Sequence, residues 1–295
     1  MEKYLQNIDY QLIKQIIFFI FAGITVGGAL YLLFTKNVLY AAYSLLLTLL
    51  GVSGLYVFAG ADFLAVSQIM IYVGGILVLM VFGIMLTHNK DTQHQTNQAN
   101  KISVSHHNVF WAVLVATLLF LGYLKVILEA NFNIIGKQTI AGSSVQKIGI
   151  NLMTDYVFAF EVIGILLLAA LIGAVFIAKK EKSWYFPAII FHSNMIYIQN
   201  YLIISALLFS IGFAVVVTKR NAILILMGIE LMLNAVNLNL VSFSQYDPNR
   251  LQGQMFALFV MVISAAEVTI ALAIIMKIYD YFKNLDLDEI NQLKN

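Results

Sequence analysis

The chain has 295 residues, a formal net charge of +2 and no cysteine. Hydrophobic residues make up 61% of it and charged residues 11%, whereas soluble domains are about half apolar and about a quarter charged. This composition excludes a soluble enzyme, a nucleic-acid-binding protein and a disordered chain. Long uncharged stretches instead predict an all-α, polytopic membrane protein embedded in a lipid bilayer.

Apolar segments long enough to cross a hydrocarbon core of about 30 Å recur along the chain. They predict eight transmembrane helices, five followed by three, at 15–35, 38–61, 63–87, 107–128, 156–178, 199–218, 222–244 and 254–279. The polar stretches between them predict a mobile aqueous loop at 88–108 and a longer, partly ordered loop at 131–155. Five spans within 1–182 and three within 199–295 divide the chain into two membrane domains.

Basic residues predict the orientation, because Lys and Arg remain on the cytoplasmic side. With the N-terminus outside, lysines follow the first, third and fifth spans on the inside. The last three spans obey the rule if residue 199 starts outside, with the C-terminus cytoplasmic. The two groups conflict only at their junction, 183–198. A short ninth crossing at 184–198 would remove the conflict; the alternative is that one basic cluster breaks the rule.

Acidic side chains inside two of the predicted spans are candidates for proton transfer. A carboxylate in hydrocarbon costs several kcal/mol or takes up a proton. Glu230 and Glu267 each lie about ten residues from a basic span end, hence about 15 Å deep. A short loop joins their helices, so we expect the two carboxyl groups to face each other and to share or relay a proton. The alternative is that both are protonated packing residues.

Further polar side chains accompany these glutamates. Asn234 and Asn237 follow Glu230 at four and seven positions, and Ser264 precedes Glu267 by three, so each is predicted to support the nearby acid. Glu161 is a third acidic candidate, about 8 Å from the outer end of the fifth span. It could serve proton transfer, pair with a polar group or face water.

Glycines in two spans admit more than one interpretation. In the third span, Tyr72 is followed by Gly74 and Gly75, which allow a π-bulge or a kink. A buried tyrosine hydroxyl beside such a break could join a chain of water molecules. The alternative is that both glycines permit close helix packing. Packing is also the interpretation that we favour for Gly23 and Gly27 in the first span.

Residues 1–182 resemble the J subunit of the proton-pumping NADH:quinone oxidoreductase, respiratory complex I, in the runs at 71–82 and 160–169. Residues 195–295 resemble its K subunit. The motifs that carry this second resemblance lie at 219–221, 228–235 and 265–268. Met195 sits where a separate K subunit would start.

The resemblance implies a membrane-arm subunit that couples quinone reduction to proton translocation. In the family, the K-type glutamates, here Glu230 and Glu267, lie on a hydrated proton path, and rotation of a π-bulge near the J-type tyrosine, here Tyr72, opens or closes it. The implied partners are the quinone-site subunit, the A-type subunit and the antiporter-like subunits of a bacterial cytoplasmic (inner) membrane. NAD, FMN, iron–sulfur clusters and quinone belong to partner subunits, with no cofactor or metal in this chain.

Two other classes of function share these features. Similar segments with intramembrane acids occur in multi-subunit cation/proton antiporters and in membrane-bound hydrogenases. A purely structural membrane scaffold would not need the glutamates to titrate.

Overall fold

A computed structural model describes residues 2–87, 109–130, 144–178, 197–246, 251–282 and 285–287. Its helices are α1 (Glu2–Phe34), α2 (Val38–Phe58), α3 (Asp62–Ser67), η1 (Gln68–Ile76), α4 (Leu77–Leu86), α5 (Val109–Glu129), α6 (Ser144–Met153), α7 (Val157–Ala178), α8 (Ile198–Thr218), α9 (Ala222–Phe243), η2 (Ser244–Tyr246) and α10 (Gln252–Phe282). The predicted all-α class is confirmed. In the part of the chain that is described, seven continuous helical segments are long and apolar enough to cross a membrane. α3, η1 and α4 together form one of these segments. Val157–Ala170, the first part of α7, counts as a shorter apolar helix.

Two of the helical hairpins begin their second helix with the same cap. The Asn37 side chain accepts hydrogen bonds from the backbone of Leu39 and Tyr40 at 2.9 and 3.4 Å. Asn221 does the same for the first turn of α9, at 3.0 and 3.4 Å. An asparagine in this position satisfies backbone N–H groups that the helix leaves free, so the sequence fixes where α2 and α9 start. Gly60, with a φ of 70°, makes the sharp turn from α2 into α3.

One predicted loop contains a helix that the sequence interpretation missed. α6 lies within 131–155, and its Ile148 is fully buried. Leu152, one turn further along, packs against the same core. Apolar side chains four residues apart lie on one face of a helix and anchor it, even where the surrounding sequence is polar. The loop predicted at 88–108 lies outside the described residues.

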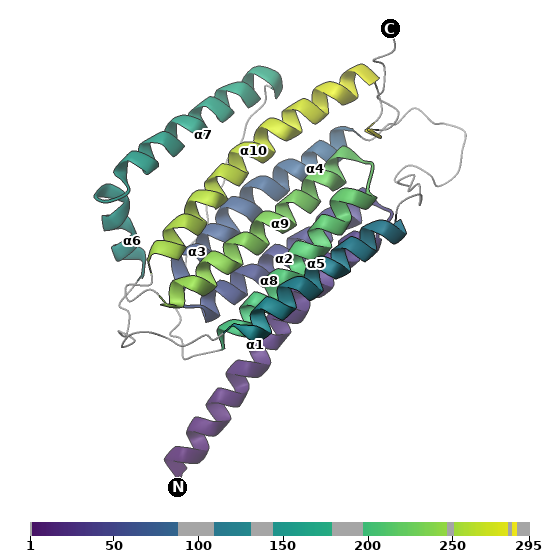
Figure 1. Ribbon diagram of the computed structural model, residues 1–295. Coiled ribbons are helices and arrows are strands. Elements are labelled where there is room, and N and C mark those ends of the chain that lie inside the picture. The colour runs from purple at the N-terminus through teal and green to yellow at the C-terminus, as the bar shows by residue number, and fades with distance from the viewer. Residues whose placement is uncertain are drawn as a thin grey trace.

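Contacts between distant helices fix their directions (Figure 1). α1 and α8 run parallel, since the rings of Phe18 and Tyr201 meet at 5.0 Å and the Lys219 ammonium donates to the Thr35 carbonyl at 2.9 Å. The third span, α3 to α4, runs parallel to α10. Figure 1 shows α7 beside α10 with the same direction. The last residue of α7 and the first of α8 therefore lie at opposite ends of the bundle. The crossing predicted at 184–198 lies outside the described residues except for its last two, Tyr197 and Ile198, and Ile198 begins α8.

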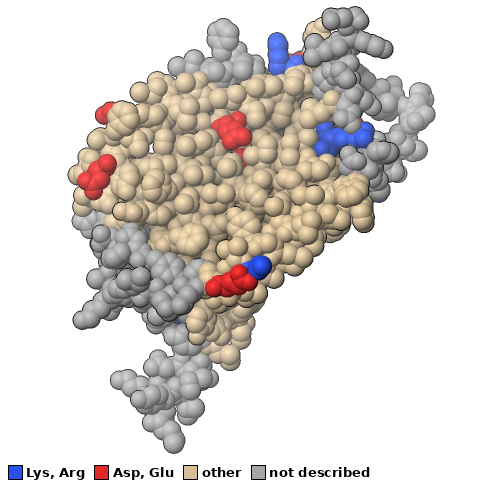
Figure 2. Space-filling view, viewed as in Figure 1, with Lys and Arg blue, Asp and Glu red and all other residues tan. Residues whose placement is uncertain are grey.

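The two ends of the bundle differ in charge. We call one the lysine end, where Lys36, Lys219 and Arg220 lie between helices, and the other the Gly60 end, where Gln254 donates to the Gly60 carbonyl at 3.4 Å. The space-filling view shows a broad face that is almost free of charge between them (Figure 2). Such a surface suits contact with lipid or with other membrane-embedded chains.

Glycines bring helices together, but not at the first motif that we expected. Gly212 of α8 and Gly228 of α9 face each other so closely that an added Cβ on Gly212 would lie 2.8 Å from the Gly228 carbonyl oxygen. Gly28 packs in the same way against α2. Gly23 and Gly27 meet no atom within 4 Å, so the packing interpretation of this pair is wrong within the described chain. Neighbouring positions on a helix point about 100° apart. Gly28 therefore faces α2, whereas Gly27, the residue before it, points in a different direction.

Candidate functional site

Glu230 lies at the centre of the bundle on α9. Its side chain is 0% exposed. Both of its carboxyl oxygens accept a hydrogen bond from the Ser264 hydroxyl of α10, at 2.9 and 2.8 Å. Because α9 starts at Ala222, the carboxyl group is about 12 Å from the helix start. A carboxyl group at this depth, held by a neighbouring helix, is the most unusual polar feature of the bundle.

Two amide side chains, those of Asn234 and Gln68, connect Glu230 and Ser264 to the third span. The Asn234 side chain donates to the backbone carbonyl of Glu230 at 2.9 Å. Gln68, at the start of η1, donates to the Asn234 side-chain oxygen at 2.6 Å. Hydrogen bonds thus join η1 to α9, and α9 to α10. The sequence interpretation gave Gln68 no role, although an uncharged amide in an otherwise apolar span is itself a signal.

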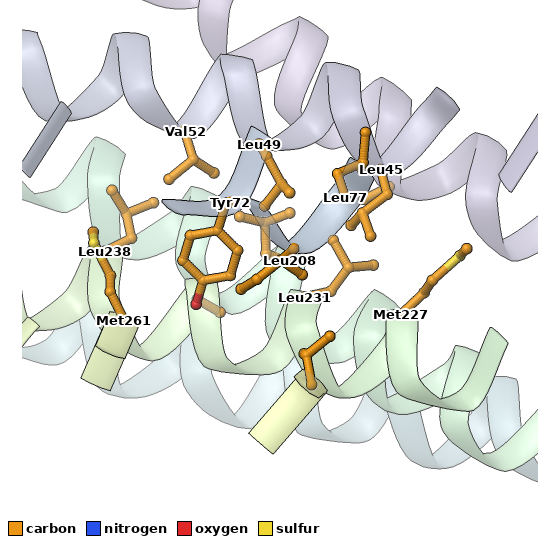
Figure 3. Packing of buried hydrophobic residues seen from close by; sticks show 14 of the residues in the cluster. Leu45, Leu49, Val52, Tyr72, Leu77, Leu208, Met227, Leu231, Leu238 and Met261 are labelled. Carbon is orange, nitrogen blue, oxygen red and sulfur yellow. The ribbon is translucent and has the colours of Figure 1, made fainter. Parts of the chain in front are cut away.

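Tyr72, on η1, lies beside the same cluster of polar side chains. Its side chain is fully buried, and Figure 3 shows the ring among aliphatic side chains, with the hydroxyl pointing away from Leu49 and Val52 of α2. The hydroxyl lies near Ser264 and Asn234. Among the described residues it has no partner at hydrogen-bond distance. The third span therefore brings a free hydroxyl to the buried carboxyl group.

The helix that carries Tyr72 has π geometry over nine residues, Gln68–Ile76. The Leu77 amide donates to the Tyr72 carbonyl, five residues back. A Cβ on Gly74 or Gly75 would meet only carbonyl oxygens of the same helix, at 3.6 and 3.9 Å. The distortion that paired glycines allow is present, whereas close packing against another helix, the alternative, finds no contact at either glycine among the described residues. Wide helical turns of this kind are frequent at functional sites.

Glu267 does not face Glu230 across the helix pair, which corrects our expectation. Its side chain is exposed at the surface of α10, whereas Ser264 is fully buried. Positions three apart differ by about 60° around a helix, and here the boundary between the packed and the open face of α10 falls between them. Ser264 supports Glu230 rather than its own neighbour. Glu267 nevertheless lies near Glu230.

The remaining candidates divide between the centre and the surface. Asn237 is fully buried, and neither atom of its amide has a partner among the described residues. Glu161 is exposed near the start of α7, which packs on α10 through contacts such as Tyr156 with Phe259, at 5.9 Å between rings. None of the described contacts joins Glu161 to Glu230. The structure thus brings together Glu230, Ser264, Asn234 and Tyr72, and leaves Glu161 apart.

The chemistry open to this group is proton transfer. Within the described ranges, no three His, Asp or Glu side chains gather where they could hold a metal ion. The five histidines lie outside those ranges. A carboxyl group and hydroxyls can take up, give up and pass protons, and the amides can orient them by donating and accepting hydrogen bonds.

Long apolar helices packed around a buried carboxyl group define a multi-pass membrane protein. The family model of NADH-ubiquinone/plastoquinone oxidoreductase chain 6 matches residues 28–177, and that of chain 4L matches residues 200–295. The chain therefore belongs to the membrane subunits of NADH–quinone oxidoreductase, complex I, with a chain 6 (J-type) part joined to a chain 4L (K-type) part. The resemblance seen in the sequence is confirmed.

Curated relatives match the two parts separately. NAD(P)H-quinone oxidoreductase subunit 4L of Leptolyngbya boryana is 52% identical over 98 residues, which are 33% of this chain and 97% of the relative. NADH-quinone oxidoreductase subunit K of Chlorobaculum parvum is 48% identical over 97 residues, 33% of this chain and 91% of the relative. The chloroplastic subunit 6 of Anthoceros angustus is 35% identical over 170 residues, 56% of this chain and 84% of the relative.

Proposed function

We propose that this chain couples quinone reduction to proton translocation in the membrane arm of complex I, with Glu230 as the group that takes up and releases the proton. The observation that carries the proposal is the double hydrogen bond from Ser264 to a carboxyl group that is 0% exposed. A buried acid that served only to join helices would be an expensive choice, because a carboxamide or a hydroxyl could make the same contact without an ionisable group.

The geometry suggests an order of transfer. A proton on the Glu230 carboxyl group can pass through the Ser264 hydroxyl once the hydroxyl has turned its own hydrogen away from the carboxyl group, because it then accepts the proton on a lone pair and gives up its own proton on the other side. Glu267, one turn beyond Ser264 and exposed on α10, is the acceptor at the surface of the chain. From there a neighbouring membrane subunit can receive the proton. Glu161, on α7 beside α10, is an accessory acid on the same side of the molecule.

Tyr72 and the π-helix act as the switch in this proposal. Rotation of η1 about Gly74 and Gly75 would move the Tyr72 hydroxyl toward or away from the Glu230 group. Among the described residues, a Cβ at either glycine would meet only atoms of the same helix, so the glycine side of η1 leaves room for the motion. In one position of η1, the Tyr72 hydroxyl is close enough to exchange a proton with the Glu230 group. In the other position, the hydroxyl is too far away and proton transfer stops. Asn234 and Asn237 support this group on α9.

The surroundings of the chain complete the proposal. We assign 1–182 to a J-like domain, 199–295 to a K-like domain and 183–198 to their junction. The partners are the quinone-site, A-type and antiporter-like subunits, and NAD, FMN, iron–sulfur clusters and quinone are bound by partner subunits. The N-terminus lies outside and the C-terminus in the cytoplasm of a bacterial inner membrane, because the lysine end carries Lys36, Lys219 and Lys277.

The decisive test is Glu230→Gln in the assembled complex. Glutamine keeps the size of the side chain and an oxygen that can accept from Ser264, but it cannot titrate. We expect NADH-driven proton pumping, measured with a pH-sensitive dye in sealed vesicles, to fall by roughly two orders of magnitude, which is typical for loss of a proton-transferring group. Quinone reduction coupled to pumping should fall with it.

Glu129→Gln is the matched control, because Glu129 is exposed at the end of α5 and only pairs with Lys125 at 3.8 Å. It should pump normally. Tyr72→Phe should cause a smaller loss of coupling while the amount of complex is unchanged. Normal pumping by a fully assembled Glu230→Gln complex would contradict the proposal, and a similar loss in Glu129→Gln would show that the assay reports assembly.

A further inference from the structure

The tip of the α1–α2 hairpin, residues 35–37, places an exposed lysine beside a buried one at the lysine end. Lys36 is exposed, and among the described residues its ammonium group has no hydrogen bond or ion pair. The Lys219 ammonium lies 2.9 Å from the carbonyl oxygen of Thr35, the residue before Lys36, and the charge of Lys36 acts on it. Like charges held close together repel each other, and an anion beside them offsets the repulsion.

The start of two helices adds to the positive field at the hairpin tip. α2 and α9 both begin at this end of the bundle, and they pack on each other. The N-terminus of a helix carries a partial positive charge. Arg220 lies just before α9, and one carboxylate, that of Asp286, lies nearby because its backbone pairs with Asn221. Positive charge therefore exceeds negative charge among the described residues at the hairpin tip, and this favours an anionic ligand.

The outer surface of the same hairpin is aromatic. Four side chains within two turns of the tip are 51 to 73% exposed, namely Tyr31, Phe34, Tyr40 and Tyr43. Tyrosine is enriched at the boundary between lipid headgroups and hydrocarbon, where its ring contacts apolar groups and its hydroxyl reaches water. The aromatic surface therefore places the hairpin tip at the level of the lipid headgroups.

An exposed stripe on α2 leads from the tip into the hydrocarbon. Tyr40, Tyr43 and Leu47 are each at least half exposed, and their spacing by three and four residues puts them on one face of the helix. Measured from Val38, they lie about 3, 8 and 14 Å along α2. The headgroup layer is about 5 to 7 Å thick on each side of a bilayer. The stripe thus crosses this layer and continues beyond it, as the acyl chain of a lipid does.

We propose that the phosphate of an anionic phospholipid pairs with Lys36 at the hairpin tip, and that its acyl chain lies along Tyr40, Tyr43 and Leu47. The excess of positive charge selects an anion, and the stripe into the hydrocarbon selects a lipid over free phosphate. Basic sites between transmembrane helices are known to hold such headgroups. The bound phosphate offsets the repulsion between Lys36 and Lys219. The site uses neither Glu230 nor proton translocation, so it is independent of the proposed function.

Photocrosslinking in the assembled complex tests this site. The complex is reconstituted into nanodiscs that contain a small fraction of phosphatidylglycerol with a diazirine in one acyl chain, or of phosphatidylcholine with the same chain. After illumination, labelled peptides of this chain are identified and quantified by mass spectrometry. We expect the phosphatidylglycerol probe to label 38–47 about fivefold more than the phosphatidylcholine probe does, which is the preference that one lysine near a membrane surface supplies.

Variants show whether Lys36 causes this preference. Lys36→Gln should abolish it, and Lys36→Arg should keep it. Lys277→Gln is the matched control, because Lys277 is exposed toward the same end but lies on α10, which packs on α7 and α9. It should leave the preference unchanged. Inorganic phosphate should reduce labelling no more than potassium chloride at the same ionic strength does.

Three results would each overturn the proposal. The two probes could label 38–47 equally, or Lys277→Gln could lose as much of the preference as Lys36→Gln does. Displacement by inorganic phosphate, beyond the effect of potassium chloride, would show that the site holds the free anion. Absence of label from both probes on 38–47 would be the third result, because it would show that a partner subunit covers the hairpin.

Discussion

Lys219 is a basic residue held largely out of water at the lysine end. Its side chain is 6% exposed, and its ammonium group donates to the Thr35 carbonyl just beyond α1. A cation at the end of a helix satisfies a carbonyl that the helix leaves free. Burial holds the pKa of Lys219 below its ordinary value of 10.5, and the nearby charge of Lys36 lowers that pKa further. The contact therefore ties the K-type part to the J-type part at some electrostatic cost.

This cost predicts how stability depends on pH. Between the lowered pKa of Lys219 and 10.5, the unfolded chain binds more protons there than the folded chain does, so stability rises with pH across that interval. Heating the purified complex and following release of this chain on native gels should show the unmodified chain gaining stability relative to Lys219→Met as the pH rises from neutral. Lys36→Gln removes the second cause and should reduce the gain. An identical pH profile for the unmodified chain and Lys219→Met would contradict this account.

The third span shows how one element combines stability with a local distortion. α3 and α4 are regular, and the π geometry between them coincides with Tyr72, Gly74 and Gly75. Glycine disfavours a regular helix by about 1 kcal/mol relative to alanine. The two glycines thus weaken the regular α-helix that the flanking apolar residues would otherwise form, without making room for another helix.

Gly74→Ala and Gly75→Ala should favour a regular helix at this point. An added methyl group would be in ordinary contact with its own helix, at 3.6 and 3.9 Å from the nearest atoms, so we expect normal amounts of complex. Each change should shift the balance toward regular helix by about 1 kcal/mol, roughly fivefold. Coupled proton pumping should fall, measured as protons moved per NADH oxidised. Gly83→Ala, in the regular part of the same span and 3.4 Å from a flexible Leu272 methyl, is the control. An equal loss in Gly83→Ala would show that the effect is not specific to the π-helix.

At the scale of the whole molecule, the two parts of the chain form one bundle. α1 packs on α8, α2 packs on α9, and the third span packs on both α9 and α10. The Phe18–Tyr201 ring contact and the Lys219–Thr35 hydrogen bond join the parts near opposite ends. Non-covalent contacts of this kind are able to hold two separate chains, and K-type relatives that cover only the last third of this sequence exist on their own.

Residues 1–182 and 195–295 should therefore assemble when they are produced as two chains. We expect both to co-purify with the complex and to restore most of its quinone reductase activity. The measurement is affinity purification through one chain, followed by mass spectrometry for the other. Adding Lys219→Met to the split pair should lower recovery more than it does in the continuous chain, because the covalent link no longer keeps the parts together. Failure of the split pair to assemble would mean that the junction itself is needed.

The sequence alone determined the class of fold and the apolar spans, including the starts of α2 and α9, where the structure shows Asn37 and Asn221 as caps. These depend on local properties: the length of apolar runs, the cost of charge in lipid and the bonding of one side chain to the next turn. It also singled out Glu230 and Tyr72, because a carboxyl group and a tyrosine beside two glycines are unusual in such a span. The short helix α6 was missed because its polar surroundings hide the two apolar residues that anchor it.

Only the tertiary structure decided which way each polar side chain faces. Glu230 and Glu267 are equivalent by depth, yet one is buried and the other lies at the surface, because packing against α8 and the third span covers one side of the helix pair and leaves the other open. The same packing turned Ser264 toward Glu230 and placed Gln68 beside Asn234. In the described part of the chain, it left Gly23 and Gly27 without a neighbouring helix. A helical repeat places side chains around an axis, but which side is covered depends on helices far away in the sequence.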